Sequence, residues 1–255
     1  RYQPYENRET TIMKQILTIL ILGVITTGNI YSQEIKKFNY QFDLGTTLSV
    51  PYKKTIENLP EFEGHPQTDY GSSFGYFCEL LVSYNINHKF FIQTGLNYNS
   101  NRIDINDKIG LIENKGSILT SYLNIPLYLG LRPVDDLPMT VSIGPYVGFI
   151  MIAREEGTTF IDTAGFISME PDPILTSIEP KQDYDTDIKG DYNSVDFGLT
   201  LQLDYELKLS ENIKGVILTR FNYGMTNVLT NDLINNNSAS DWKNYSLLVG
   251  FGLKL

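Results

Sequence analysis

The chain is dominated by short segments in which apolar and polar residues alternate. In Tyr245–Leu255 the odd positions carry Tyr, Leu, Val, Phe, Leu and Leu, and the even positions carry Ser, Leu, Gly, Gly and Lys. Successive side chains of a β-strand point to opposite faces of the sheet, so this pattern predicts a strand with one large apolar face and one small or polar face. Such a strand is typical of a closed barrel whose apolar side meets lipid.

Seven further segments show the same period of two. They are Phe38–Leu48, Phe74–Ile86, Phe90–Tyr98, Tyr122–Leu131, Met139–Met151, Val195–Leu207 and Val216–Met225. The connections alternate in length: 51–71, 99–117, 153–192 and 227–243 are long and polar, and those between them are short. Outer-membrane barrels have short periplasmic turns and long external loops. The pattern predicts an all-β fold, an eight-stranded antiparallel up-and-down transmembrane β-barrel with both ends at the periplasmic mouth.

The rival fold is a soluble eight-stranded barrel of lipocalin type, with large apolar residues inside and polar residues outside. Glycine on the polar face argues against it, because a solvated exterior is dominated by larger polar side chains whereas a crowded lumen favours small ones. The glycines of this face are Gly45, Gly75, Gly95, Gly130, Gly144, Gly148, Gly198, Gly250 and Gly252. We therefore favour the membrane barrel.

Two local irregularities are expected. Pro126 and Pro145 lie inside predicted strands, and each removes a backbone donor, so we expect a bulge or a gap in the ladder there. Within the longest connection, Thr159–Ile161 and Phe166–Ile167 are predicted to pair as a small hairpin above the membrane.

The first 32 residues show a different pattern. Met13-Lys14 precedes the short apolar run Ile16–Ile25, which small and polar residues follow. This predicts a signal peptide over 13–32 cleaved after Ser32, because the run is far shorter than the roughly 20 residues of a spanning helix. We interpret 1–12 as an upstream extension and 33–255 as the barrel domain, exported through the cleaved signal peptide to the outer membrane.

The net charge and the cysteine count exclude several kinds of partner and site. The 255 residues carry a formal net charge of −10, which argues against nucleic acid as a partner. The single cysteine, Cys78, excludes an intramolecular disulfide framework and a cysteine metal cluster. We expect no cofactor.

The candidate site is a set of charged residues on the inward face: Asp43, Glu79, Asp196, Asp204, Glu206, Arg220 and Lys254. An eight-stranded barrel has an interior just wide enough for side chains to fill, so these charges must pair or meet water. We predict that Glu79, Asp196 or Asp43 surrounds Arg220, and that Lys254 pairs with acidic residues nearer the periplasmic mouth. Two interpretations remain open, a structural plug that closes the lumen and a gated pore or proton path.

The longest connection carries Asp183, Asp185 and Asp187, whose spacing is similar to the start of a calcium-binding loop. The glycine comes too late, at Gly190, and no Glu occupies the twelfth position, so a solvated acidic loop is the preferred interpretation. We predict no metal site.

Enzymatic motifs are sparse. The chain has two histidines, His65 in a predicted external loop and His88 in a predicted turn, and it has no Ser–His constellation or phosphate-binding glycine loop. Carboxylates of the loop around His65 are the one alternative for a surface hydrolase. We expect that the protein is not an enzyme.

Four short motifs carry a resemblance to a known family: Tyr122–Leu127 (YLNIPL), Gly144–Gly148 (GPYVG), Tyr223–Asn227 (YGMTN) and Gly250–Leu253 (GFGL). In this order and spacing, over the whole of 33–255, they resemble the PorT-like outer-membrane β-barrel family of Bacteroidetes-type bacteria. One member of that family is linked to secretion and gliding machinery, and the family offers no catalytic residues to carry over. By resemblance to other outer-membrane barrels, Tyr245, Phe251, Leu253 and Leu255 form the signal read by the barrel assembly machinery.

Two functions remain from the sequence. One is a structural or interaction barrel that displays external loops or docks a periplasmic or secretion-system protein. The alternative is a small passive pore or channel, similar to a porin. The expected partners are outer-membrane lipid, the assembly machinery and that periplasmic or secretion protein.

Overall fold

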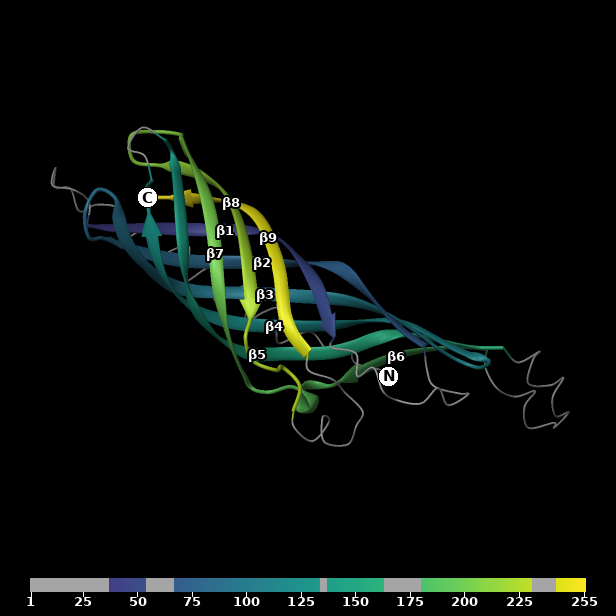
Figure 1. The fold of residues 1–255 in the computed structure, drawn as a ribbon. Helices are drawn as coiled ribbons and strands as arrows, with labels where there is room; N and C mark the ends of the chain where they lie inside the picture. The colour runs from purple at the N-terminus through teal and green to yellow at the C-terminus, as the bar shows by residue number, and fades with distance from the viewer. Residues whose placement is uncertain (1–36, 54–66, 134–136, 163–179, 231–241) are drawn as a thin grey trace, which may run out of the picture.

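Eight long strands form a closed ring in the computed structural model, which describes residues 37–53, 67–133, 137–162, 180–230 and 242–255 (Figure 1). The strands are β1 (Phe38–Lys53), β2 (Gln67–Asn85), β3 (Phe90–Ile109), β4 (Ile112–Leu131), β5 (Met139–Ile161), β6 (Lys181–Asp187), β7 (Val195–Lys208), β8 (Lys214–Gly224) and β9 (Trp242–Lys254). All pair with antiparallel neighbours. Since β9 pairs with β1 and β4 with β5, the ring β1-β2-β3-β4-β5-β7-β8-β9 is closed, and the predicted eight-stranded barrel is confirmed.

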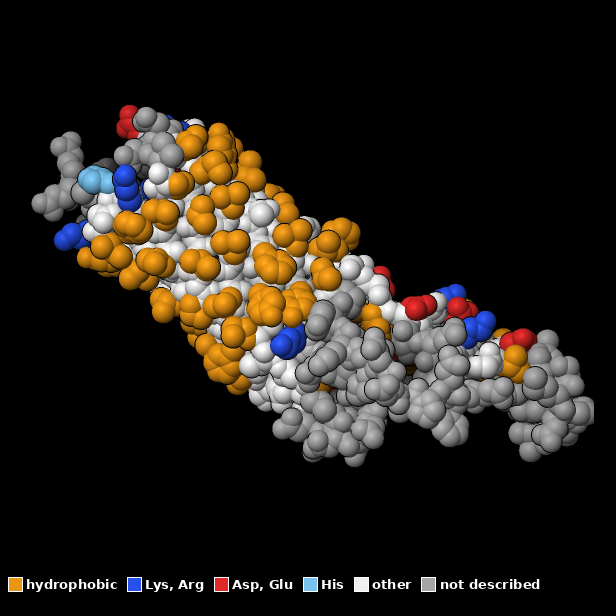
Figure 2. All heavy atoms as spheres, in the orientation of Figure 1, with side chains coloured by type: hydrophobic (Ala, Val, Ile, Leu, Met, Phe, Trp, Pro, Cys, Tyr) orange, Lys and Arg blue, Asp and Glu red, His pale blue; other side chains and the backbone are white. Residues whose placement is uncertain are grey.

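The predicted faces of the strands are confirmed as well. Large apolar side chains are exposed around the outside of the ring, including Leu127 at 54%, Leu201 at 51% and Phe251 at 63% (Figure 2). Polar residues such as Gln41 and Gln202 are fully buried inside it. A soluble barrel would have the reverse arrangement, because exposing this much contiguous apolar surface to water is unfavourable. The lipocalin-type alternative is therefore excluded.

Four neighbouring strands continue far beyond the ring. β2, β3, β4 and β5 are 19, 20, 20 and 23 residues long, whereas about 9–11 residues cross a bilayer. Their distal halves form a sheet that projects from one side of the barrel, to which β6 adds along Arg154–Phe160 of β5 (Figure 1). We call this sheet the external extension.

The prediction of long loops over 51–71, 99–117 and 153–192 is wrong for much of their described residues, because these residues belong to strands of the external extension or of the ring. The 99–117 connection is regular β3–β4 hairpin apart from a two-residue turn, Gly110-Leu111, and Gly110 has a φ of 55°. A positive φ costs glycine nothing, so the chain reverses here without strain. Residues 51–53 belong to β1, 67–71 to β2 and 153–161 to β5. Thr159–Ile161 pairs with β4, and Thr159 and Phe160 also pair with β6; Phe166–Ile167 lies outside the described residues.

The periplasmic turns agree with the sequence. Residues 86–89 join β2 to β3 and residues 209–213 join β7 to β8. Near Pro126 the ladder is interrupted on both sides, since no pairs form between Thr94–Leu127 and Asn97–Asn124, or between Pro126–Tyr146 and Leu129–Ile143. The predicted gap is confirmed at Pro126, whereas Pro145 lies in a gap on its β4 side and pairs without interruption on its β7 side. A register shift occurs at Ser121/Tyr122 and not at either proline.

A hydrophobic cluster lies at the external end of the barrel. Its buried members are Ile103, Ile105, Ile118, Tyr122, Ile150, Ala153, Tyr192, Val228, Leu229 and Trp242. The segment around Tyr192, which follows the short helical turn η2 (Lys189–Asp191), is bridged to Leu229, so the β5–β7 and β8–β9 connections both contribute residues to this cluster. Within the described part of the chain no helix has the length and apolarity to cross a membrane. Residues 1–36, which include the predicted signal peptide, lie outside the described residues.

Candidate functional site: the lumen and its periplasmic mouth

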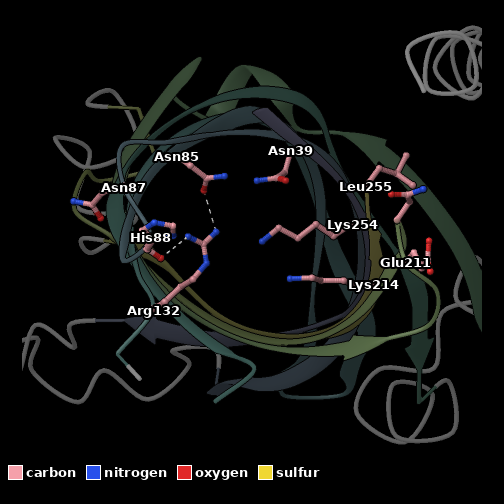
Figure 3. Close-up of a pocket in the computed structure, with 10 residues that line it drawn as sticks. Asn39, Asn85, Asn87, His88, Arg132, Glu211, Lys214, Lys254 and Leu255 are labelled. Atoms are coloured by element: carbon pink, nitrogen blue, oxygen red, sulfur yellow. Dashed lines mark hydrogen bonds between the residues drawn. The ribbon is translucent and has the colours of Figure 1, made fainter. Parts of the chain in front are cut away.

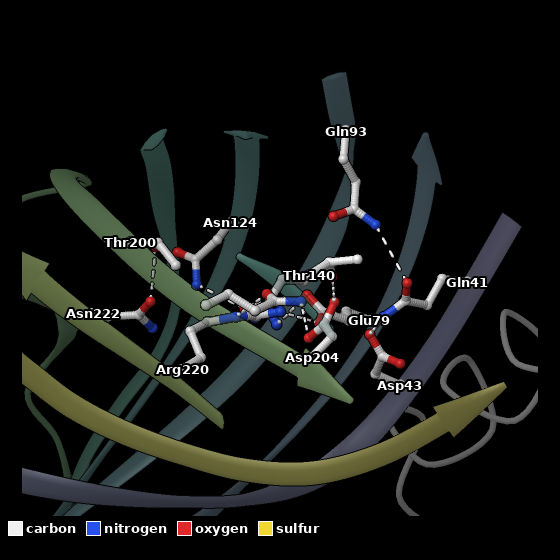
Figure 4. Close-up of polar contacts among 12 residues, drawn as sticks. Gln41, Asp43, Glu79, Gln93, Asn124, Thr140, Thr200, Asp204, Arg220 and Asn222 are labelled. Carbon is white, nitrogen blue, oxygen red and sulfur yellow. Dashed lines mark hydrogen bonds and ion pairs between the residues drawn. The ribbon is translucent and has the colours of Figure 1, made fainter. Parts of the chain in front are cut away.

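Arg220 of β8 is at the centre of the lumen (Figure 4). Its Nη2 forms an ion pair with Glu79 of β2, and its Nε donates to Oε1 of Gln202 on β7 at 2.8 Å. The guanidinium also lies 5.7 Å from the ring centres of Phe77 on β2 and Tyr128 on β4. Since β8 and β2 are separated by β9 and β1 in the ring, one side chain ties opposite walls of the barrel together.

Two further carboxylates share this layer with Arg220. Asp43 stands opposite Glu79 in the β1–β2 register and accepts a hydrogen bond from Gln41 Nε2 at 2.8 Å. Asp204 accepts one from Gln202 Nε2 at 2.8 Å, so Gln202 links the guanidinium to a second acid. Glu79 also accepts from Asn97 Nδ2 at 3.2 Å. Three acids around one arginine form a layer held by hydrogen bonds as much as by charge pairing.

The predicted Arg220 network is confirmed for Glu79 and wrong for Asp196. Asp196 accepts hydrogen bonds from Thr226, from Tyr146 Oη at 3.3 Å and from Asn244 Nδ2 at 3.0 Å, near the external end of the barrel. The sequence gives the inward face of a residue but not its height along the barrel. Arg220 pairs with Gln202, which is six residues after Asp196 on β7. The phenols of Tyr122, Tyr128 and Tyr146 also face inward.

A second charged layer lies nearer the periplasmic mouth. Lys254 Nζ and Lys214 Nζ each lie 2.6 Å from a different oxygen of Glu206. Lys254 and Glu206 are almost fully buried, whereas the Lys214 side chain is 53% exposed. The predicted pairing of Lys254 with an acid at this end is confirmed.

The sequence missed several contributors. Lys214 was outside the predicted strand because the apolar alternation begins at Val216. Gln41, Gln93 and Gln202 are buried in the lumen and relay hydrogen bonds there. The alternation pattern already places each of these three residues at an inward-facing position of its strand. They were not selected as candidates because the selection was based on charged side chains, and glutamine is uncharged.

The periplasmic mouth is hollowed into a pocket of about 360 Å³ (Figure 3). Its lining includes Asn39, Asn85, Arg132, Lys214 and Lys254, with His88 and Glu211 at the rim. Arg132 Nη2 donates to Asn85 Oδ1 at 3.0 Å and Nη1 donates to the His88 carbonyl at 3.1 Å. His65, the other histidine, lies outside the described residues.

The predicted acidic loop is partly a strand. Asp183, Asp185 and Asp187 alternate along β6, and Asp183 accepts a hydrogen bond from Thr158 Oγ1 at 2.7 Å. Alternate residues of a strand are roughly 6.8 Å apart, too far for three carboxylates to share one small ion. Among the described residues, no group of three His, Cys, Asp or Glu side chains gathers in metal-binding geometry.

The terminal strand closes the ring as predicted. Phe251 and Leu253 are exposed on its outer face, Tyr245 stacks on Tyr223 with ring centres 5.0 Å apart, and Leu255 exchanges backbone hydrogen bonds with Tyr40. Of the residues assigned to the assembly signal, Phe251 and Leu253 therefore face outward, whereas Leu255 lines the pocket at the periplasmic mouth.

The lipid-facing belt, the closed antiparallel ring and the polar lumen together define an outer-membrane β-barrel protein. Residues 31–230 match the family described as outer membrane protein beta-barrel domain, and the chain belongs to this family.

Among solved structures, the chain is similar to Ail of Yersinia pestis, with 11% identity, coverage of 86% of this chain and 99% of that one, and a TM-score of 0.37. It is also similar to Neisserial surface protein A, with 12% identity, coverage of 86% of this chain and 97% of that one, and a TM-score of 0.39. The same holds for OprG of Pseudomonas aeruginosa, with 12% identity, coverage of 88% and 99%, and a TM-score of 0.36. No curated protein matches the sequence.

Proposed function

We propose that the protein is a structural and interaction barrel that holds the external extension above the membrane and docks a partner, and that it does not conduct. The observation that carries this proposal is the Arg220 layer, in which one side chain contacts three strands across the lumen. Such a layer fills the interior of an eight-stranded barrel. The hydrophobic cluster at the external end supports the same conclusion, because it adds a second barrier on the lumen axis.

The partner in this proposal is a periplasmic or secretion-system protein. The support is the resemblance to PorT-like barrels of Bacteroidetes-type bacteria, whose motif residues lie on strands of the ring and on the segment that follows β8. The proposal includes export through the signal peptide over 13–32 and insertion by the barrel assembly machinery.

The proposed role is not enzymatic. His88 lies in the β2–β3 turn, where its carbonyl accepts a hydrogen bond from Arg132. The buried acids Glu79 and Asp204 are hydrogen-bonded within the Arg220 layer and turned away from solvent, so a substrate in water does not reach them.

Crosslinking in intact cells tests the partner. Outer membranes of a strain carrying an affinity-tagged chain are crosslinked, solubilised and captured, and the captured proteins are identified by mass spectrometry. We expect one periplasmic or secretion protein in stoichiometric amount, absent when an unrelated tagged eight-stranded barrel is captured under the same conditions. Capture of assembly-machinery components alone, at the level seen for the unrelated barrel, would refute a docking role.

Planar-bilayer recording tests the passive pore. The purified barrel should show no steady conductance above that of a protein-free bilayer. A large and steady single-channel conductance in the unmodified protein would refute the closed-lumen proposal in favour of the pore.

A further inference from the structure

The pocket at the periplasmic mouth has an excess of positive charge in an acidic protein. Arg132, Lys214 and Lys254 point into it from different parts of the ring, and its lining also contains Glu211 and the last residue, Leu255 (Figure 3). Glu206, which contacts both lysines, is outside the lining. The chain as a whole has a formal net charge of −10. A concave surface lined by one sign of charge concentrates ligands of the opposite sign.

Among the described residues, Arg132 is the cation of this pocket that has no carboxylate partner. Its guanidinium donates hydrogen bonds to two neutral acceptors, the Asn85 amide and the His88 carbonyl. In the part of the chain that the structure describes, no carboxylate lies within ion-pair distance of its guanidinium. A guanidinium has five donors arranged to bind a carboxylate with two parallel hydrogen bonds. Arg132 is therefore positioned to receive an acid from outside the barrel.

Phe91 holds the cations in place. The Arg132 guanidinium lies 4.9 Å and the Lys254 ammonium 5.5 Å from the centre of its ring. The ring packs so closely on Gly130 that a side chain at that position would collide with it. Attraction between a cation and an aromatic face orients both charged groups before a ligand arrives, which lowers the entropy lost on binding.

The two lysines are not equivalent. Lys254 is buried and its ammonium contacts Glu206, so it forms the inner wall. The Lys214 side chain is 53% exposed while contacting the other oxygen of the same carboxylate. One carboxylate shared by two ammonium groups leaves both able to attract a second acid, and Lys214 is the one that an entering ligand meets.

We propose that this pocket binds the carboxylate side chains of an acidic, extended segment of a periplasmic protein. The opening lies inside the strand ring, and the apolar belt of Phe38, Phe90 and Leu253 separates it from the surrounding lipid. The volume of about 360 Å³ is at the lower end of ligand pockets, which suits a few side chains. The Asn39, Asn85 and Asn87 amides in the lining match peptide groups, because an amide both donates and accepts.

This inference rests on the proposed function, since it names the chemistry by which the barrel docks its partner. The full barrel in phosphatidylcholine nanodiscs is titrated by calorimetry with the peptide acetyl-Glu-Glu-Glu-Glu-amide, and with its all-Gln counterpart as the neutral control. The variants are Arg132→Gln, Lys214→Gln and, as a matched control, Lys89→Gln. Lys89 is in the same turn region with an exposed side chain but does not line the pocket.

We expect the Glu peptide to bind, the Gln peptide not to bind, and added salt to weaken binding. Arg132→Gln and Lys214→Gln should each weaken it roughly tenfold, whereas Lys89→Gln should leave it within about twofold. Heat-modifiable migration in gel electrophoresis verifies that each variant is folded.

Three outcomes would overturn the inference. These are no binding of the Glu peptide at millimolar concentration, equal losses in all three variants, and displacement of the peptide by inorganic phosphate or by phosphatidylglycerol added to the nanodisc. Failure is distinguishable from failure of the proposed function. If Arg132→Gln captures the same crosslinked partner in the same amount as the unmodified chain, the pocket assignment fails and the docking role stands.

Discussion

The Arg220–Glu79 pair offers the sharpest test of how the lumen is held together. Arg220→Gln removes the one cation of the central layer and leaves Glu79, Asp43 and Asp204 buried without it. Removing one partner of a buried ion pair costs about 3–5 kcal/mol. Glu79→Gln should cost less, about 2 kcal/mol, because Arg220 keeps its hydrogen bond to Gln202 and still shares the layer with two acids, Asp43 and Asp204.

A double-mutant cycle separates the pair from its surroundings. The double variant Arg220→Gln/Glu79→Gln should cost about 3 kcal/mol, well below the sum of the single variants, because neither partner is left unpaired. The matched control is Arg102→Gln, which breaks the half-exposed pair with Glu156 in the external extension. That variant should cost less than about 1 kcal/mol.

The assay is urea-induced unfolding in lipid vesicles, followed by the fluorescence of Trp242, the single tryptophan. Trp242 is buried in the external cluster, and the Tyr70 ring meets it edge-on at 5.2 Å, so unfolding changes its environment. With a urea slope of about 2 kcal/mol per molar, Arg220→Gln should lower the midpoint by roughly 2 M. A shift no larger than that of Arg102→Gln, or a double variant equal to the sum of the singles, would refute the reasoning.

Three further predictions follow from the wall of the barrel. Phe251→Asp places a charge on the lipid face and should abolish the membrane-inserted, heat-modifiable species. Ser246→Thr changes a residue of the inner face and should leave insertion intact. Normal insertion of Phe251→Asp would contradict the outward assignment of this side chain. Gly144→Val should strongly reduce the refolding yield in vesicles, because a Cβ atom at this position would be 1.9 Å from the Leu127 carbonyl oxygen. Gly190→Val, which has open space around it, should refold normally, and equal yields would refute the packing argument. In hydrogen exchange, amides of β6 should exchange faster than those of β7, because among the described strands β6 pairs with one neighbour and β7 with two. Equal protection would contradict the edge position of β6.

The faces of the strands in the ring were readable from the sequence because lipid and lumen impose opposite chemistry on alternate residues. That logic placed Arg220, Glu79 and Lys254 inside correctly. It could not give the relative heights of residues on different strands, since the shear of the barrel is set by pairing between strands and not by any one of them. Asp196 was therefore assigned to the wrong layer.

The external extension was missed for a different reason. Outside the bilayer the demand for a continuous apolar face ends, and β3 contains Asn99, Asn101 and Asn106, residues that are depleted in strands. Pairing along the whole β3–β4 hairpin outweighs these local preferences. Arg132 and Lys214 escaped notice similarly, because they lie just beyond the apolar alternation, where sequence alone reads as a turn or a strand end.

The tight Gly110-Leu111 turn has a consequence for how this protein can vary in height. Because the β3–β4 hairpin is regular on both sides of that turn, two residues added to each strand beside it lengthen the sheet by one pleat and keep every side chain on its original face. The membrane-spanning register below is untouched. A single added residue on one strand would instead invert the faces between the insertion and the tip. Reach above the cell surface can therefore change in even steps, independently of the part that anchors the molecule in lipid.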